Sequence, residues 1–141
     1  MPSCSRDFDE RHFQKGLREV DKFWSRFPEK PNIAGKRILD LGCGRGAMVL
    51  SLAQAGGTYV LGVDLDEERI AFARDKAAAE YSSFAERVDF RCVDLNELPE
   101  DEKFDVIVSK DTFEHVQDVP GVLAAMRARL APGGKIYLGF G

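Results

Sequence analysis

Histidine and cysteine, the residues that usually hold structural metals or disulfides, are scarce in this sequence. It contains two histidines and three cysteines in 141 residues. Cys4, Cys43 and Cys92 show neither a CxxC spacing nor a cluster of histidines nearby, so we expect neither a disulfide framework nor a structural metal site. Three reduced thiols are typical of an intracellular protein, and we expect a cytoplasmic location.

Long apolar runs and a strong charge of one sign are also missing. The most apolar stretch, residues 47–63, is interrupted by Gln54, Gly56, Gly57 and Thr58, and the first residues lack the apolar core of a secretory signal. We therefore expect no membrane segment. The formal net charge is −4, with both signs mixed along the chain, which does not favour nonspecific binding to DNA phosphates.

The sequence does contain enough apolar material for one core. Its hydrophobic fraction is 44%, and its length suits a single domain. In residues 6–27 the apolar side chains recur at helical spacing, at Phe13, Leu17, Val20, Trp24 and Phe27. We expect residues 1–34 to form an amphipathic helix and a linker. The helix would either pack on the domain or act as a mobile lid, and residues 35–141 would form the core.

The core alternates short apolar runs with helical segments. Strands are predicted at residues 37–41, 58–64, 87–94, 104–109 and 135–140, where Val, Ile, Leu and Phe are enriched. Helices are predicted at residues 47–55, 67–81 and 119–130, and Asp66 and Asp118 are expected to cap the last two. This order predicts an α/β fold with a doubly wound parallel sheet, whose ligand site lies beyond the carboxyl ends of the strands.

The loop after the first strand is rich in glycine and reads Asp40-Leu-Gly42-Cys43-Gly44-Arg-Gly46. Glycines let a backbone turn tightly and approach a ligand closely. By itself this loop leaves a dinucleotide, a mononucleotide or S-adenosylmethionine open. The G-x-G-x-G spacing differs from the pyrophosphate-binding G-x-G-x-x-G, and Asp40 would repel a pyrophosphate. The loop therefore favours a ligand with a cationic amino-acid tail.

Two further acidic residues follow strands. Asp64, after the second strand, could accept both hydrogen bonds of a ribose diol, or could simply be a turn residue before the Asp66 cap. Asp94, followed by Leu95, comes after the third strand and could meet the amino group of an adenine.

Taken together, these segments resemble the class I S-adenosylmethionine-dependent methyltransferases. The resemblance covers residues 36–141 and rests on ILDLGCGRG (38–46), LGVDLDEERIAFAR (61–74), FRCVDLNELP (90–99), FDVIVSKDTFEHV (104–116) and LAPGGKIYLGF (130–140). It implies a Rossmann-like sheet and S-adenosyl-L-methionine as the cofactor.

The resemblance also assigns roles to residues. Gly42, Cys43, Gly44 and Gly46 would surround the methionine part, and Asp40 would orient its amino end. Asp64 and Leu65 would contact the ribose side, and Asp94 and Leu95 the adenine. Ser109 and Lys110 would line the sulfonium side, mainly through backbone atoms.

His115 is the candidate for a catalytic base if the acceptor is a hydroxyl, although the sequence favours the alternative that it closes its loop by hydrogen bonds or packing. In a sharper variant, Asp111, Glu114 and His115 resemble the metal-binding run of some O-methyltransferases. Since the same letters occur in metal-free relatives, we expect no metal.

The predicted function is methyl transfer to an oxygen, nitrogen or carbon atom of a small molecule. The loop after the fourth strand reads SKDT, without the Pro-Pro clamp of the DNA base methyltransferases. Two alternatives stay open, an NAD(P)-binding oxidoreductase and a non-catalytic S-adenosylmethionine-binding module.

Family members usually add an antiparallel C-terminal hairpin after the fifth strand. The sequence ends at Gly141, close to the end of that strand. We therefore expect the hairpin to be missing and the fifth strand to form an edge that could support self-association.

Overall fold

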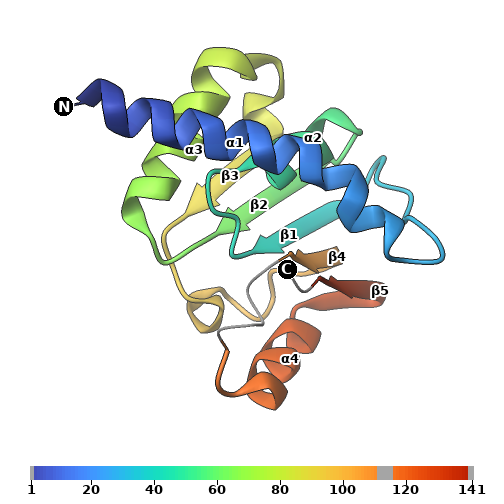
Figure 1. Cartoon of the computed structure of the whole chain (residues 1–141). Coiled ribbons are helices and arrows are strands. Elements are labelled where there is room, and N and C mark those ends of the chain that lie inside the picture. The colour runs from blue at the N-terminus through green and yellow to red at the C-terminus, as the bar shows by residue number, and fades with distance from the viewer. Residues whose placement is uncertain (1, 111–115, 140–141) are drawn as a thin grey trace.

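The computed structural model describes residues 2–110 and 116–139, which form a parallel sheet with helices on both faces (Figure 1). The five strands follow the order β3-β2-β1-β4-β5, and neighbouring strands are parallel. Their bounds are β1 (Arg37–Leu41), β2 (Tyr59–Val63), β3 (Val88–Arg91), β4 (Phe104–Ser109) and β5 (Leu130–Leu138). The predicted Rossmann-like fold is confirmed.

The helices begin close to where the sequence predicted them. They are α1 (Pro2–Ser25), α2 (Ala47–Gln54), α3 (Glu67–Glu80) and α4 (Val119–Ala128), with short 3₁₀ helices η1 (Ser82–Arg87) and η2 (Leu95–Glu97). The Asp66 carboxylate accepts hydrogen bonds from the backbone N–H groups of Glu68 and Arg69 at 3.0 and 3.1 Å, which caps α3. Asp118 caps α4 by accepting from Gly121 N at 3.0 Å.

Alternate strand residues face two separate cores. Ile38, Val60 and Val106 belong to the core under α1, α2 and α3, whereas Leu39, Leu61 and Ile107 belong to the core under η2 and α4. Both faces of the central strands are therefore buried, as a parallel sheet requires. In the sheet, β1 has β2 on one side and β4 on the other, so the direction of the strand order reverses at β1. In sheets of this kind the ligand cleft lies where the order reverses, here between the carboxyl ends of β1 and β4.

β3 is shorter than predicted and ends at Arg91 rather than at residue 94. The backbone N–H of Asp94 donates to the Glu97 carboxylate at 2.8 Å, and the chain turns there into η2. Asp94 therefore lies in a turn beyond the strand, because a local side-chain hydrogen bond replaces continued pairing with β2.

β5 begins earlier than predicted, at Leu130 rather than at residue 135. Phe104 of β4 pairs with Leu130 and Val106 pairs with Lys135, so residues 131–134 form a bulge within the strand. α4 correspondingly ends at Ala128 rather than at residue 130. The reason is that the Arg129 carbonyl already accepts a hydrogen bond from Phe104 N at 2.8 Å.

α1 packs on the sheet through an aromatic face, as the packed alternative predicted. Phe13, Phe23 and Trp24 are buried, and the Trp24 ring meets Tyr137 of β5 edge-on at 5.4 Å between ring centroids. In the described residues no helix is long and apolar enough to cross a membrane.

A nearly buried lysine also holds α1 to α3. The Lys76 ammonium donates to Glu10 of α1 at 2.5 Å and also pairs with Glu80. Burial lowers the pKa of Lys76, but its hydrogen bonds with the two carboxylates outweigh that effect and raise it. The hydrogen bond from Lys76, aided by one from Gln14, lowers the pKa of Glu10.

The lowered pKa of Glu10 predicts an acid-sensitive contact between α1 and α3. A carboxyl whose pKa is lower in the folded state stabilises that state above its unfolded pKa, and the contribution is lost as pH falls through the lowered value. We expect the unfolding temperature of the wild type to fall more between pH 6 and pH 3 than that of Glu10→Gln. Glu29→Gln, at an exposed position of the α1–β1 linker, serves as the control and should follow the wild type. Parallel curves for wild type and Glu10→Gln would contradict the prediction.

Candidate functional site

Two adjoining cavities open at the carboxyl ends of the strands. The first, here called the α1-side cavity, has a volume of about 530 Å³ and lies between α1, the glycine loop and the end of β4. The second, the α4-side cavity, has a volume of about 480 Å³ and lies between the ends of β1 and β2, the turn at η2, and α4. Gly42 and Arg69 line both cavities, so the two lie side by side at this edge of the sheet.

Most of the site residues predicted from the sequence line this site. The α1-side cavity is lined by Asp40, Gly42, Cys43, Gly44 and Lys110. The α4-side cavity is lined by Gly42, Asp64, Leu65, Asp94 and Leu95. His115, Asp111 and Glu114 lie outside the described residues.

Gly46 and Ser109 line neither cavity, because packing and hydrogen bonds inside the protein occupy them. A Cβ atom placed on Gly46 would lie 2.9 Å from the Phe90 ring, so this glycine lets α2 approach β3. The buried Ser109 hydroxyl donates to the Leu41 carbonyl at 3.0 Å and thereby joins the ends of β4 and β1.

The glycine loop is held by hydrogen bonds to the end of β2. The N–H groups of Gly42 and Cys43 both donate to the Val63 carbonyl at 2.9 Å, and Gly44 N donates to Asp64 Oδ2 at 2.8 Å. These donors are therefore engaged within the protein, unlike the free N–H groups of a phosphate-binding loop. Gly44 has a φ of +54°, and a Cβ placed there would meet no atom within 4 Å, so the loop leaves open space for a ligand.

The Asp64 carboxylate holds its own turn together while facing the α4-side cavity. Besides Gly44 N, it accepts from Asp66 N through Oδ1 at 2.9 Å. A carboxylate has about four lone-pair positions, so both oxygens can still accept hydrogen bonds from a ligand diol. Leu65 beside it is 72% exposed and offers an apolar surface at the cavity rim.

Asp40 places a carboxylate, only 2% exposed, at the wall of the α1-side cavity. The Cys43 thiol is buried and is close enough to this carboxylate and to that of Asp64 for both charges to act on it. Burial, and then these two negative charges, raise the pKa of the Cys43 thiol far above its usual range. The thiol therefore stays protonated at neutral pH and is not available as a nucleophile.

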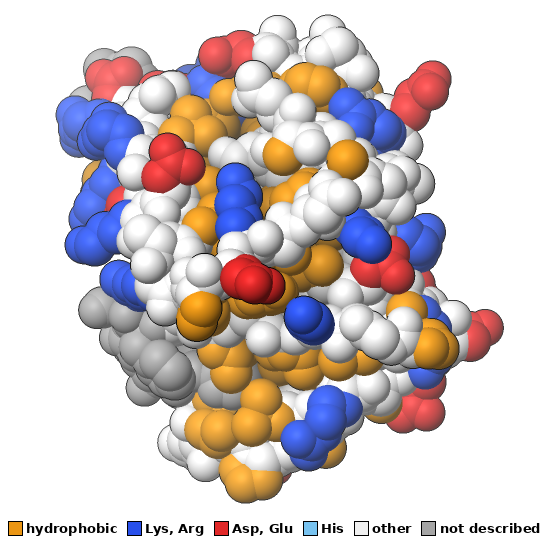
Figure 2. All heavy atoms as spheres, turned by 90° about the vertical axis from the view of Figure 1, so that its right-hand side faces the viewer, with side chains coloured by type: hydrophobic (Ala, Val, Ile, Leu, Met, Phe, Trp, Pro, Cys, Tyr) orange, Lys and Arg blue, Asp and Glu red, His pale blue; other side chains and the backbone are white. Residues whose placement is uncertain are grey.

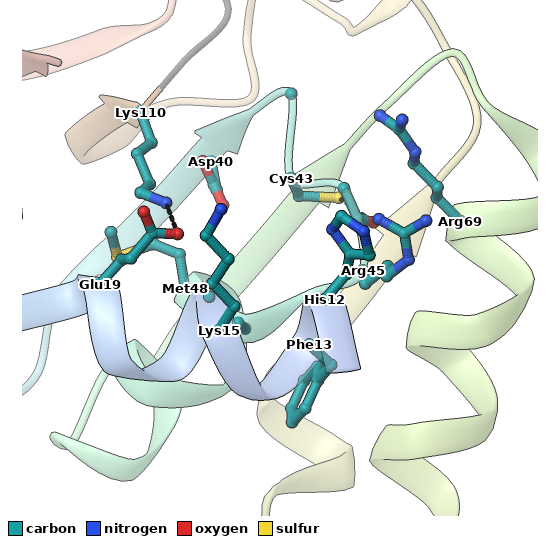
Figure 3. A pocket seen from close by; sticks show the side chains of 14 residues that line it. His12, Phe13, Lys15, Glu19, Asp40, Cys43, Arg45, Met48, Arg69 and Lys110 are labelled. Carbon is teal, nitrogen blue, oxygen red and sulfur yellow. Dashed lines mark hydrogen bonds and ion pairs between the residues drawn. The ribbon is translucent and has the colours of Figure 1, made fainter. Parts of the chain in front are cut away.

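The structure adds residues of α1 that the sequence analysis did not assign to the site. His12, Lys15 and Glu19 extend from α1 and line the α1-side cavity from the side of this helix, as Figure 3 shows. Lys110 donates to Glu19 at 2.9 Å, and this hydrogen bond is the main cause of the lowered pKa of Glu19. The sequence did contain a signal for these positions: His12, Lys15 and Glu19 recur at helical spacing beside the apolar stripe of the predicted helix.

Arg45 and Arg69 were also missed, although both lie within motifs quoted for the resemblance. Arg45 Nε donates to Asp9 of α1 at 2.7 Å, and Arg69 lies 3.5 Å from Asp66. Within residues 2–110 and 116–139, no group of three His, Cys, Asp or Glu side chains could hold a metal ion.

The sequence matches the family model described as a methyltransferase domain over residues 38–134. The chain belongs to the class I S-adenosylmethionine-dependent methyltransferase family. This membership decides against the NAD(P)-binding oxidoreductase that the glycine loop alone left open.

The proteins to which this chain is similar include both O- and N-methyltransferases. The chain is 29% identical over 148 residues to the ubiquinone biosynthesis O-methyltransferase of Neisseria meningitidis serogroup A, covering 92% of this chain and 61% of that protein. It is 34% identical over 135 residues to phosphoethanolamine N-methyltransferase 1 of Zea mays, covering 94% of this chain and 26% of that protein.

Among solved structures, an S-adenosylmethionine dependent methyltransferase from Mesorhizobium loti superimposes on this chain with a TM-score of 0.65. The two are 30% identical, and the match covers 85% of this chain and 49% of that one. The chain thus spans about half of that structure, and between 26% and 61% of the two curated relatives.

Proposed function

We propose that this protein is an S-adenosyl-L-methionine-dependent methyltransferase acting on a small-molecule acceptor. The observation that carries the proposal is the pair of cavities that meet at Gly42, with Asp40 in one and Asp64 and Asp94 in the other. S-adenosylmethionine has a cationic amino-acid end and a nucleoside end, and each end needs the acceptor groups that one cavity supplies. We assign the cofactor site to residues 35–141 and its cover to residues 1–34.

The residues present fit the cofactor. Gly42, Cys43 and Gly44 would surround its methionine part, and the open space at Gly44 supports this assignment. Asp40 would accept from the ammonium group, and Asp64 from the ribose hydroxyls. Leu65 would contact the ribose side and Leu95 the adenine, with Asp94 exposed at the rim where it can accept from the adenine amino group. Lys110, at the end of β4, would face the sulfonium side.

When bound, S-adenosylmethionine would supply a methyl group already activated by positive sulfur. The chain would mainly position the acceptor on the line of attack. For a hydroxyl acceptor, His115 would take the hydroxyl proton as the acceptor oxygen bonds to the methyl carbon and the methyl–sulfur bond breaks, so that S-adenosylhomocysteine would be the leaving group. The names of the O- and N-methyltransferase relatives support an oxygen or nitrogen acceptor.

The net charge of −4 and the SKDT loop also support a metabolite acceptor rather than DNA. The free thiols of Cys43 and Cys92 support a cytoplasmic location. A non-catalytic S-adenosylmethionine-binding module remains the second candidate, because a related fold could keep the cofactor cavities without turnover.

The first prediction tests the nucleoside end of the site. Calorimetry should show that S-adenosylmethionine binds and NAD does not. Asp64→Ala should weaken S-adenosylmethionine binding roughly ten- to a hundredfold, or about 1.5 to 3 kcal/mol, because it removes charge-assisted acceptors. Asp75→Ala, on the exposed side of α3, is the matched control.

Unchanged affinity in a folded Asp64→Ala protein would contradict the ribose assignment. Because Asp64 also anchors Gly44, the unfolding temperature of each variant is measured as well.

The second prediction separates an enzyme from a binding module. In a labelled-methyl assay with small phenols, alcohols and amines, the wild type should transfer the methyl group to at least one acceptor. His115→Ala should reduce transfer to oxygen acceptors roughly a hundredfold or more and leave S-adenosylmethionine affinity unchanged.

A chelator should not affect cofactor binding. Binding without any transfer would favour the module, and full activity in His115→Ala would exclude His115 as the base.

We also propose that the edge strand β5 supports self-association. β5 pairs with β4 alone among the described strands. A groove of about 820 Å³ beside it is lined partly by Phe27, Pro132, Ile136 and Tyr137. On the side shown in Figure 2, hydrophobic side chains are exposed between lysine and arginine side chains. An apolar strand edge with free backbone groups can pair with the same strand of a second copy.

This surface predicts a concentration-dependent dimer. Light scattering of the chain should show dimers that Ile136→Lys disrupts, while Lys135→Arg, which keeps the charge pattern, leaves them intact. Hydrogen exchange at residues 136–138 should be slower in the dimer. A strictly monomeric protein whose residues 136–138 are strongly protected would contradict the proposal.

A further inference from the structure

Lys110 and Glu19 form an ion pair where β4 ends. The Lys110 ammonium donates to the Glu19 carboxylate at 2.9 Å, and both side chains line the α1-side cavity. The close view shows Lys110 extending from the end of the strand toward Glu19 of α1 (Figure 3). The pair therefore holds a lysine ammonium in the part of the site that the proposed function gives to the sulfonium.

The backbone from which Lys110 extends is fixed on two sides. The hydroxyl of the preceding residue, Ser109, donates to the Leu41 carbonyl at 3.0 Å, and the Ser109 carbonyl accepts from Gly139 N at 2.8 Å. The side chains of Lys110 and Glu19 are 23% and 35% exposed, so an acceptor that enters from solvent can reach them. A lysine ammonium carries several N–H donors, and it can donate to an acceptor atom while it keeps its hydrogen bond to Glu19.

The charges around Lys110 favour one kind of acceptor atom. Four lysine or arginine side chains and two carboxylates of the described residues line the α1-side cavity. They are Lys15, Arg45, Arg69 and Lys110, and Glu19 and Asp40, with His12 as a further titratable group. Bound S-adenosylmethionine would add its positive sulfonium. Coulomb's law therefore favours an acceptor atom that becomes negative there over one that becomes positive.

Oxygen and nitrogen acceptors differ in this respect. A hydroxyl gives up its proton, and its oxygen carries negative charge until it bonds to the methyl carbon; the methyl–sulfur bond breaks and S-adenosylhomocysteine leaves. An amine attacks as the neutral base, and its nitrogen becomes positive while the same bonds form and break. A lysine ammonium beside the acceptor atom stabilises the charge that develops on the oxygen and opposes the charge that develops on the nitrogen.

Glu19 does not supply the base that an amine acceptor would need. Aliphatic amines are protonated at neutral pH and must lose a proton before they attack. The hydrogen bond from Lys110 is the main cause of the lowered pKa of Glu19, so this carboxylate is a weak base. The ion pair thus suits a developing oxyanion better than a protonated amine.

We propose that the acceptor atom is a hydroxyl oxygen and that Lys110 is a catalytic residue, whose ammonium donates to this oxygen as the hydroxyl proton leaves. The inference rests on the proposed function, because it assumes that S-adenosylmethionine occupies the two cavities. The proton goes to His115, as proposed above, and Lys110 stays charged throughout. Glu19 is a positioning residue that holds the ammonium in place from α1.

The chromophore 4-nitrophenol tests this role without turnover, because its phenolate absorbs visible light. The protein is saturated with S-adenosylhomocysteine, and the absorbance of bound 4-nitrophenol is followed as the pH is raised. At a given pH below the midpoint of this titration, the wild type should hold about ten times more phenolate than Lys110→Gln, because a nearby opposite charge favours the ionised form. Lys110→Arg should retain most of the effect. Lys22→Gln, an exposed change on α1 outside both cavities, is the matched control and should titrate like the wild type.

Glu19→Gln separates this role from the docking of α1. Lys110→Gln and Glu19→Gln both break the ion pair, so a merely structural pair would give the same titration curve in both variants. We expect Glu19→Gln to keep more of the phenolate than Lys110→Gln, since the lysine remains in the cavity. Thermal denaturation of each variant shows whether it is folded.

A matched pair of acceptors gives a second readout. Catechol and 1,2-diaminobenzene have the same shape and differ in the acceptor atom. In a labelled-methyl assay the wild type should transfer to catechol at least about tenfold faster, and Lys110→Gln should lose this preference.

The outcomes separate the two proposals. If the wild type does not bind S-adenosylhomocysteine, the proposed function fails. If it binds, the Lys110 assignment is overturned by equal phenolate in the wild type and folded Lys110→Gln, by the same titration curve in Glu19→Gln and Lys110→Gln, or by faster transfer to 1,2-diaminobenzene. The proposed function would stand in each of these cases. A loss of phenolate in Lys110→Gln that Lys110→Arg restores supports the assignment.

Discussion

The carboxylate of Asp64 is the contact on which the arrangement of the site depends. Through one oxygen it accepts from Gly44 N at 2.8 Å, and through the other from Asp66 N at 2.9 Å. It thus joins the glycine loop after β1 to the turn that begins α3. Because the N–H groups of Gly42 and Cys43 also donate to the end of β2, the loop lies flat over the sheet. The two cavities meet where it passes between them.

The loop can lie so close to the sheet only because β2 has a glycine beneath it. A Cβ atom on Gly62 would lie 2.8 Å from both the Cβ and the Sγ of Cys43. The same close contact buries the Cys43 thiol and raises its pKa. One sequence feature, a small residue in a strand, therefore determines the loop height and keeps the thiol chemically inert.

α1 completes the site from outside the βαβ units, since it packs on α2 near Ala47 and pairs with both ends of the cleft through Asp9 and Glu19. A helix that shares its aromatic face with the core cannot move without exposing Phe13, Phe23 and Trp24. The helix that covers the sheet therefore also has a defined position over the ligand site. The N-terminal segment thus lines part of a cavity whose sequence motifs all lie after residue 35.

The sequence alone determined the elements and predicted most of the residues that line the two cavities, because both depend on local patterns. Apolar runs separated by helical segments predict the parallel sheet, the caps at Asp66 and Asp118 follow from short-range hydrogen bonds, and residues at strand ends such as Asp40, Asp64 and Asp94 must meet at one edge of the sheet. Only the tertiary structure decided which groups form hydrogen bonds or close contacts with the predicted site residues. It showed that Ser109 is bonded to Leu41 and that Gly46 serves packing. It also paired Lys110 with Glu19, two residues 91 positions apart in the sequence. Such contacts depend on how closely helices and strands approach in space, and no local pattern in a single sequence encodes that distance.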